Sequence, residues 1–223
     1  RKRGQYQHLG GDRHHGGGGE FFLDHQIGRK RQRQRQRDIG WHALPKGQNL
    51  DHFVGEAIDR WLPALADEGL VDFVDLFCEA GYFRTSDLLR LAEAADQRGI
   101  RLKAHTNQFQ SIGGVSAAIQ AKALSIDHLE VFSDDDRSAL GASWSQGIGP
   151  MPVALPHCSL FLNIPYTPGR AIIDAGLPLA IASDYNPGSS PSSDQSTAAL
   201  PLTTNSMGPS PFDQFTVCGA MVR

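Results

Sequence analysis

The sequence predicts an α/β fold in which parallel strands alternate with helices, as in part of a (β/α)8 barrel. Short apolar stretches recur between turn signals, and amphipathic helical patterns separate them. Each stretch also ends at a titratable side chain; these are Glu79, His105, His128, His157 and Asp184. Their spacing of 23 to 29 residues is close to one strand–helix unit of such a barrel.

A doubly wound sheet shares this alternation, but it does not require a titratable group at the end of every strand. No Gly-x-Gly-x-x-Gly motif follows a strand candidate, which further lowers that alternative. The pattern therefore favours the barrel.

The elements can be assigned in chain order from residue 38. An apolar stretch closed by Pro45 precedes helical spacing over 53–65, and Pro63 should bend or shorten that helix. Ser133 with Asp136 forms a capping-box pattern, and Thr167 with Pro168 predicts a capped helix that ends at Gly176. The strand candidates are 71–77, 100–104, 124–127, 151–155 and 177–183; further helices are expected at 86–98 and 114–123.

The stretch 177–190, which reads LPLAIASDYNPGSS, organises the rest of the chain. Its apolar run is typical of a buried parallel strand, and it ends abruptly at Asp184. A carboxylate at the carboxyl end of such a strand lies where α/β barrels carry their chemistry. The polar turn that follows supplies backbone and side-chain polar groups.

Charge and composition divide the chain into three segments. The net charge is −3, but residues 1–37 carry ten Lys or Arg against three Asp or Glu, and the remainder is acidic. This basic, low-complexity segment 1–37 has no apolar face to bury, so we expect it to be disordered or translated out of frame. Residues 38–192 form the predicted barrel domain, and 193–223 are a Ser/Thr/Pro-rich tail of uncertain structure.

Composition excludes several classes of protein. No run of eighteen apolar residues occurs, so we expect no membrane-spanning helix. Three scattered cysteines argue against a disulfide framework and for a reducing compartment. The basic run at 29–37 lacks the interleaved aromatic residues that stack on bases, which favours a disordered segment over a nucleic-acid partner.

Side chains at successive strand ends converge over one mouth of a barrel. Two imidazoles and a carboxylate there, from His105, His128 and Asp184, are the usual ligands of a hydrolytic Zn²⁺ or Fe²⁺. Asp184 would hold the metal and take the proton of the attacking water, and His128 would hydrogen-bond the oxyanion or that water. Each residue alone also fits a structural hydrogen-bonding role.

Several specific stretches carry a resemblance to a known family. They are WHALP at 41–45, VDLFCEAGYF at 74–83, KAHTNQFQSIGG at 103–114, SIDHL at 125–129, MPVALPHCSLFL at 151–162 and PYTPGRAIIDAGLPLAIASDYNPGSSPS at 165–192. Together they cover most of residues 38–192. They resemble imidazolonepropionase, a metal-dependent hydrolase of the amidohydrolase superfamily with a TIM barrel.

The resemblance implies an activity and a site. The family opens the ring of 4-imidazolone-5-propanoate, a small-molecule substrate, to N-formimidoyl-L-glutamate during histidine degradation in the cytoplasm, with one Zn²⁺ or Fe²⁺ per site. By position, the metal ligands are His105 and Asp184, and the catalytic residues are Asp184, His128 and Gln108. The substrate contacts are His42, Gln108, Asn186, Gly188 and Ser189. We also expect a homodimer.

The sequence departs from the family at both ends. The family begins its barrel with a His-x-His pair of metal ligands, and no His-x-His occurs here, so the early strands are expected to be missing. If the flanks are translated out of frame, another reading frame of the source DNA should restore that pair upstream of Trp41. Two alternatives remain: a catalytically inactive barrel fragment, and nucleic-acid binding through the basic segment.

Overall fold

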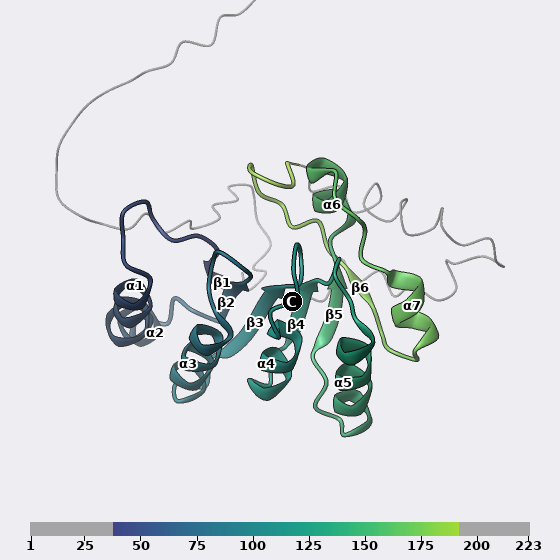
Figure 1. Cartoon of the computed structure of the whole chain (residues 1–223). Coiled ribbons are helices and arrows are strands. Elements are labelled where there is room, and N and C mark those ends of the chain that lie inside the picture. The colour runs from purple at the N-terminus through teal and green to yellow at the C-terminus, as the bar shows by residue number, and fades with distance from the viewer. Residues whose placement is uncertain (1–37, 192–223) are drawn as a thin grey trace, which may run out of the picture.

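The computed structural model describes residues 38–191, and Figure 1 shows how they are arranged. The segments 1–37 and 193–223, which the sequence sets apart from the barrel domain, lie outside the described residues. Across the part of the chain that is described, no helix is both long and apolar enough to cross a bilayer.

Six strands form one sheet, and their order in space follows their order in the chain. Every neighbouring pair is parallel. Six sequential parallel strands correspond to six of the eight in a (β/α)8 barrel, so the predicted fold class is confirmed. The strands are β1 (Asp38–Trp41), β2 (Phe73–Cys78), β3 (Arg101–Thr106), β4 (Ser125–His128), β5 (Met151–Ala154) and β6 (Ala180–Ile181).

Helices connect the strands, as parallel pairing requires. In Figure 1, α3, α4 and α5 stand in a row along one side of the sheet, whereas α6 lies beyond the carboxyl end of β5. The helices are α1 (Leu50–Glu56), the π-helix η1 (Ala57–Trp61), α2 (Leu62–Asp67), α3 (Thr85–Asp96), α4 (Gly114–Gln120), α5 (Asp134–Ser145), α6 (Pro156–Leu162) and α7 (Gly169–Asp174).

Strand β2 shows how the sequence separates the core from the mouth. Val74 and Leu76 belong to the main core cluster, where Leu88 and Leu91 of α3 are also fully buried. Successive side chains of a strand point to opposite faces, so Asp75 and Phe77 face the barrel interior. An acidic residue is thereby carried into the inner face of an otherwise apolar strand.

The helix predicted over 53–65 is interrupted rather than merely bent. The chain runs from α1 through the π-helical turn η1 into α2, which has Pro63 in its first turn. A proline cannot donate the backbone hydrogen bond of a helix interior. A π-turn just before it is one way to place the proline at the start of a new helix.

Three details after β5 differ from the prediction. Helix α6 begins at Pro156, where no helical period was predicted, and β6 spans only Ala180–Ile181 of the predicted strand 177–183. The last helix begins at Gly169 with Pro168 as its N-cap, not Thr167. The reason is that the Thr167 hydroxyl donates to the His128 carbonyl oxygen at 2.6 Å, so it does not cap the helix.

The capping box of α5 forms as predicted. The Ser133 hydroxyl accepts a hydrogen bond from the Asp136 amide at 3.1 Å, and the Ser133 amide donates to the Asp136 carboxylate at 3.0 Å. The same carboxylate accepts from the Asn107 side chain at 3.2 Å. The cap therefore fixes both the start of α5 and the loop that follows β3.

Replacing Ser133 by Ala should lower the free energy of unfolding by about 1 kcal/mol, because an amide of the first turn loses its acceptor. Urea unfolding followed by circular dichroism measures this change. Ser138→Ala is the matched control, since this exposed hydroxyl bonds only the Asp134 carbonyl within α5 and its loss should change stability by less than about 0.5 kcal/mol. Equal losses of stability in the two variants would contradict the role of Ser133 as the N-cap of α5.

Candidate active site

The predicted strand-end residues lie together at the carboxyl ends of the strands, which we call the mouth. His105 is in β3, His128 ends β4, and Asp184 follows β6. The imidazoles of His105 and His128 meet edge to face with centroids 5.3 Å apart. Asp184 Oδ1 lies 3.9 Å from His105 Nε2. The structure thus brings together the two imidazoles and the carboxylate on which the hydrolase interpretation depends.

Three carboxylates surround the His105 ring. Asp75 contacts Nδ1 at 2.9 Å, while Asp127 and Asp184 lie 3.7 and 3.9 Å from Nε2. Burial alone lowers the pKa of His105, but the negative charges of these carboxylates outweigh burial and raise it to about 10. The ring therefore sits where positive charge is strongly favoured.

The donor atoms on the Nε2 side of His105 suit a divalent cation. Two donors that each bind zinc at about 2.0–2.2 Å cannot be more than about 4.4 Å apart, and both carboxylate distances fall within that limit. Asp127 was not identified from the sequence. Its Oδ1 atom is buried without a hydrogen-bond partner, and burial raises the pKa of this carboxyl. A cation at this place would compensate that desolvation.

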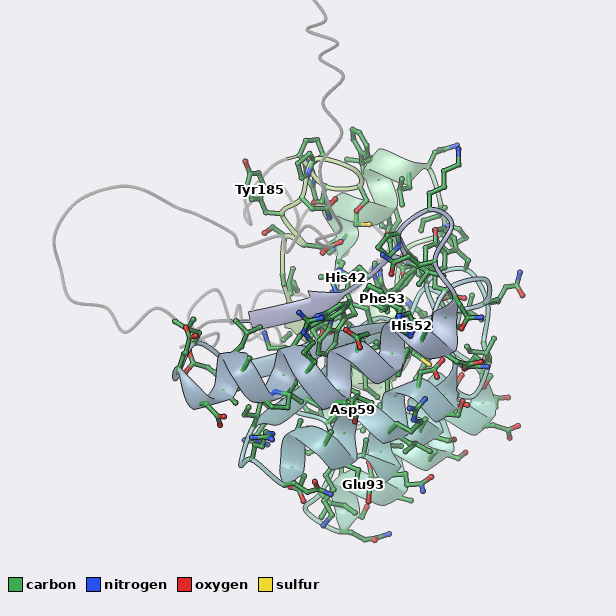
Figure 2. The ribbon with its side chains drawn as sticks, turned by 90° about the vertical axis from the view of Figure 1, so that its left-hand side faces the viewer. His42, His52, Phe53, Asp59, Glu93 and Tyr185 are labelled. Atoms are coloured by element: carbon green, nitrogen blue, oxygen red, sulfur yellow. The ribbon has the colours of Figure 1, made fainter. Side chains whose placement is uncertain are left out.

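His42 stands beside His105 at the end of β1. The two ring centroids are 4.7 Å apart, and His42 Nε2 lies 3.1 Å from Asp75 Oδ2. About half of the His42 side chain is exposed, so it can meet a ligand. Gly40 makes room for it, because a Cβ there would come within 3.0 Å of His42 Nε2. Figure 2 shows His42 at the end of β1, with Asp59 and Glu93 among the outer helices.

His128 is buried and held from several sides. Its Nδ1 lies 3.3 Å from Glu130 Oε1, which also accepts from the Ser159 hydroxyl at 2.8 Å. Its backbone has φ of +88°, a left-handed conformation that is costly for a residue with a Cβ, and the Thr167 hydroxyl bonds its carbonyl. The sequence did not identify Glu130 or Ser159, and it noted Thr167 only as a helix cap.

Gln108 is positioned by a buried acid at the end of β2. The Glu79 carboxylate accepts from the backbone amides of Gln108 at 2.9 Å, Phe109 at 3.3 Å and Gln110 at 2.9 Å. The Gln108 side chain is buried and its amide lies 3.4 Å from Cys158 Sγ. Glu79, noted in the sequence only as a strand-end residue, therefore holds the loop that carries Gln108.

The turn after Asp184 is closed on itself. Asn186 Oδ1 accepts from the amides of Gly188 at 2.9 Å and Ser189 at 2.8 Å, and its Nδ2 donates to the Asp184 carbonyl. These amides therefore stabilise the turn; their predicted contact with substrate stays a prediction. His157 of α6 contacts the same turn, with Nδ1 3.2 Å from the Ser190 hydroxyl, rather than the His105 ring.

Comparison with known proteins bears on this constellation. No family model matches the chain. A curated relative named imidazolonepropionase, from Christiangramia forsetii, is 51% identical over 156 residues, which is 69% of this chain. Relatives of the same name from Flavobacterium johnsoniae and Burkholderia lata are 47% and 40% identical over 156 residues. Over the matched stretch, the chain is similar to these imidazolonepropionases. The chain spans little more than a third, 37%, of the length of each of these relatives.

Solved structures agree on the fold. The N6-methyl-AMP deaminase of Arabidopsis thaliana has a TM-score of 0.57 and 18% identity over 80% of this chain and 50% of its own. An adenine deaminase from Arthrobacter aurescens gives the same score and identity over 76% of this chain and 50% of its own. An adenosine deaminase from Xanthomonas campestris, solved with bound zinc, has a TM-score of 0.50 and 17% identity over 76% of this chain and 42% of its own. The described residues thus share the fold of part of these three deaminases.

Two thiols among the described residues, Cys78 and Cys158, are buried and free. Burial, reinforced by the nearby Glu79 carboxylate, raises the pKa of Cys78 to about 12. Burial likewise raises the pKa of Cys158 to about 12. A thiol kept protonated in the folded chain ionises in the unfolded chain first, so each one makes stability depend on pH.

The free energy of unfolding should fall as pH rises from about 9 to 12, because unfolded thiols release protons that folded thiols retain. At pH 10 each thiol should account for about 1.5–2 kcal/mol of this loss. Urea unfolding at pH 8 and pH 10 measures it. Cys78→Ala should lose less stability than the parent over this range; an identical loss would contradict the buried, protonated thiol.

Proposed function

We propose that the chain acts in the hydrolytic ring opening of 4-imidazolone-5-propanoate to N-formimidoyl-L-glutamate, the imidazolonepropionase reaction of histidine degradation. The observation that carries the proposal is the convergence of His105, His128 and Asp184 at one mouth. Imidazolonepropionases that are 40–51% identical over 156 residues support the choice of substrate. We extend the proposal to a cytoplasmic enzyme and to a homodimer.

The donor set fits a divalent metal, for which we propose Zn²⁺ or Fe²⁺. His105 through Nε2 and Asp184 would hold it, and Asp127 offers a third oxygen nearby. When bound, such an ion lowers the pKa of water to about 7 and polarises the substrate carbonyl. The remaining chemistry falls to the side chains of this chain.

Each residue at the mouth has a role in adding water across the ring amide. Asp184 accepts a proton from the attacking water while the water oxygen bonds to the carbonyl carbon of the substrate. His128 hydrogen-bonds the oxyanion that develops on the carbonyl oxygen. The carbon–nitrogen bond then breaks, and the proton held by Asp184 passes to the departing ring nitrogen. The products carry one new carboxylate and the opened formimidoyl amine, so one water is consumed.

The substrate contacts surround this centre. His42 would meet the imidazolone ring from the end of β1, beside His105. Gln108 would contact the reacting carbonyl, because Glu79 holds its backbone at the mouth. Asn186, Gly188 and Ser189 would face the polar groups of the propanoate side chain and of the product.

A second candidate, an inactive barrel that binds metal weakly, is favoured by the sequence, which contains no His-x-His pair. Fewer protein ligands than a four-coordinate site should lower metal affinity. Binding of nucleic acid through residues 1–37 is a weaker candidate on a segment outside the described residues; it predicts strongly salt-dependent binding.

Turnover and metal content separate these candidates. The purified full chain is loaded with Zn²⁺ or Fe²⁺, the loss of imidazolone absorbance is followed, and the product is identified by mass spectrometry as one water heavier. The proposal predicts turnover that a chelator removes and that metal restores. Absence of both turnover and bound metal would favour the inactive barrel. Stoichiometric metal without turnover would also overturn the proposed activity.

A further inference from the structure

Asp75 is a buried acid that the proposed chemistry does not use. It lies in the middle of β2, and 4% of its surface is exposed. Burial alone raises its pKa, but the adjacent His105 and His42 hold the pKa of Asp75 well below its usual value. An ionised carboxylate at such a depth needs partners that satisfy it.

Strand register explains why Asp75 meets two imidazoles. Asp75 pairs with Gly40 of β1 on one side and with Lys103 of β3 on the other. His42 and His105 each lie two residues further along those flanking strands. Side chains two residues apart share a face of the sheet, so both rings lean over the same carboxylate from opposite sides.

Each hydrogen bond to Asp75 fixes one nitrogen of the ring that must carry a proton, whatever the state of the other nitrogen. An ionised carboxylate only accepts hydrogen bonds, so both imidazoles must donate to Asp75. His105 donates from Nδ1 at 2.9 Å, and His42 donates from Nε2 at 3.1 Å. His105 Nε2 is thereby turned toward Asp127 and Asp184, and His42 Nδ1 is left to accept from a ligand.

The same three side chains also form a set of donors close enough for a metal ion. Their contacts of 2.9 and 3.1 Å are normal hydrogen-bond lengths. The arrangement around His105 is that of a metal-ligating histidine whose other nitrogen is bound to a carboxylate. Asp75 thus fits the role of orienting a ligand better than that of being one.

We propose that Asp75 is a positioning residue that sets the tautomer and direction of both His105 and His42, and so couples the cation site to the substrate-facing ring. The inference rests on the proposed function for one point, that His105 ligates a metal through Nε2. It adds a residue that acts through two others and touches neither the substrate nor the ion.

Metal affinity tests the proposal without turnover. Zn²⁺ binding by the full chain is measured in competition with a chromophoric chelator for the parent and for Asp75→Asn and Asp75→Glu. Both variants should bind Zn²⁺ about 10- to 100-fold more weakly, as found when the carboxylate behind a ligating histidine is lost. Asp75→Glu keeps the negative charge but moves the carboxylate. If both variants weaken Zn²⁺ binding, the effect comes from the lost orientation of the rings and not from the lost charge alone.

Asp59→Asn is the matched control, because it removes one negative charge from an exposed position on η1, away from His42 (Figure 2). It should leave Zn²⁺ affinity within about twofold of the parent. Parent-like affinity in both Asp75 variants would overturn the proposal.

A second measurement needs no metal and no variant of Asp75. In the metal-free parent labelled with ¹⁵N-histidine, the proton on His105 Nδ1 should give a resolved, slowly exchanging signal, because it is buried in a hydrogen bond to Asp75. The signal is assigned as the one absent from His105→Gln. Absence of this signal from the parent would overturn the role of Asp75, whether or not the chain binds zinc. Failure of the parent to bind zinc would instead contradict the proposed metal-dependent function.

Discussion

Replacement of Asp184 by Asn should lower the turnover of 4-imidazolone-5-propanoate by about 10³- to 10⁴-fold. An amide cannot take the proton of the attacking water, although its oxygen can still approach a cation. Asp184 Oδ1 lies 3.9 Å from His105 Nε2, so the carboxylate is already at the cation-facing side of that ring. Steady-state rates of imidazolone loss, measured with the metal content of each sample, provide the test.

Asp174→Asn serves as the control for the loss of one carboxylate. Asp174 ends α7, is exposed, and pairs with Arg170 one helical turn earlier. Its replacement should leave turnover within about twofold of the parent, because surface pairs of this kind contribute about 0–1 kcal/mol. An Asp184→Asn enzyme that keeps a tenth or more of the parent rate would show that another group takes the proton.

Replacement of Glu79 by Ala should destabilise the fold by about 3 kcal/mol or more. The carboxylate accepts from four backbone amides, including those of Gln108, Phe109 and Gln110, and is almost fully buried. Each buried donor left without an acceptor costs about 1–3 kcal/mol. Turnover should fall as well, because the loop that carries Gln108 loses its anchor. Urea unfolding and steady-state kinetics on the same samples measure the two effects.

Glu93→Ala is the comparison variant for Glu79. Glu93 lies on the outer face of α3, where Figure 2 labels it, and is exposed. Its truncation should change the free energy of unfolding by less than about 0.5 kcal/mol. If Glu79→Ala were equally mild, the amides of the 108–110 loop must find other acceptors, and the anchoring role would be wrong.

Much of the fold could be predicted because its signals are local. The strand ending near His105, the helix opened by Ser133 and the parallel order all follow from apolar runs, caps and turn residues. Helix α6 was missed because Pro156 directly after a strand indicates a loop unless the proline occupies the first helical turn, as it does here. The role of Thr167 was missed because a hydroxyl that bonds a distant carbonyl leaves no pattern in the sequence.

From apolar runs and turn signals alone, the site was predictable only for residues that end strands. His105, His128 and Asp184 stand out because an apolar run stops at each of them. Asp75 and Asp127 lie inside their strands, and only register reveals that they flank the His105 ring. A signal for Asp75 was present, since an acid within an apolar strand requires a buried partner. Its partners, 30 and 33 residues away, could not be chosen without coordinates.

The left-handed backbone at His128 and Asp184, with φ of +88° and +50°, limits how this mouth could be transplanted. Designers who graft a catalytic constellation onto a new scaffold usually copy side chains and assume an ordinary main chain beneath them. Here the scaffold must also reproduce an unfavourable main-chain shape, together with the distant hydroxyl of Thr167 that braces it. A graft that omitted this support would let the imidazole relax away from its working direction.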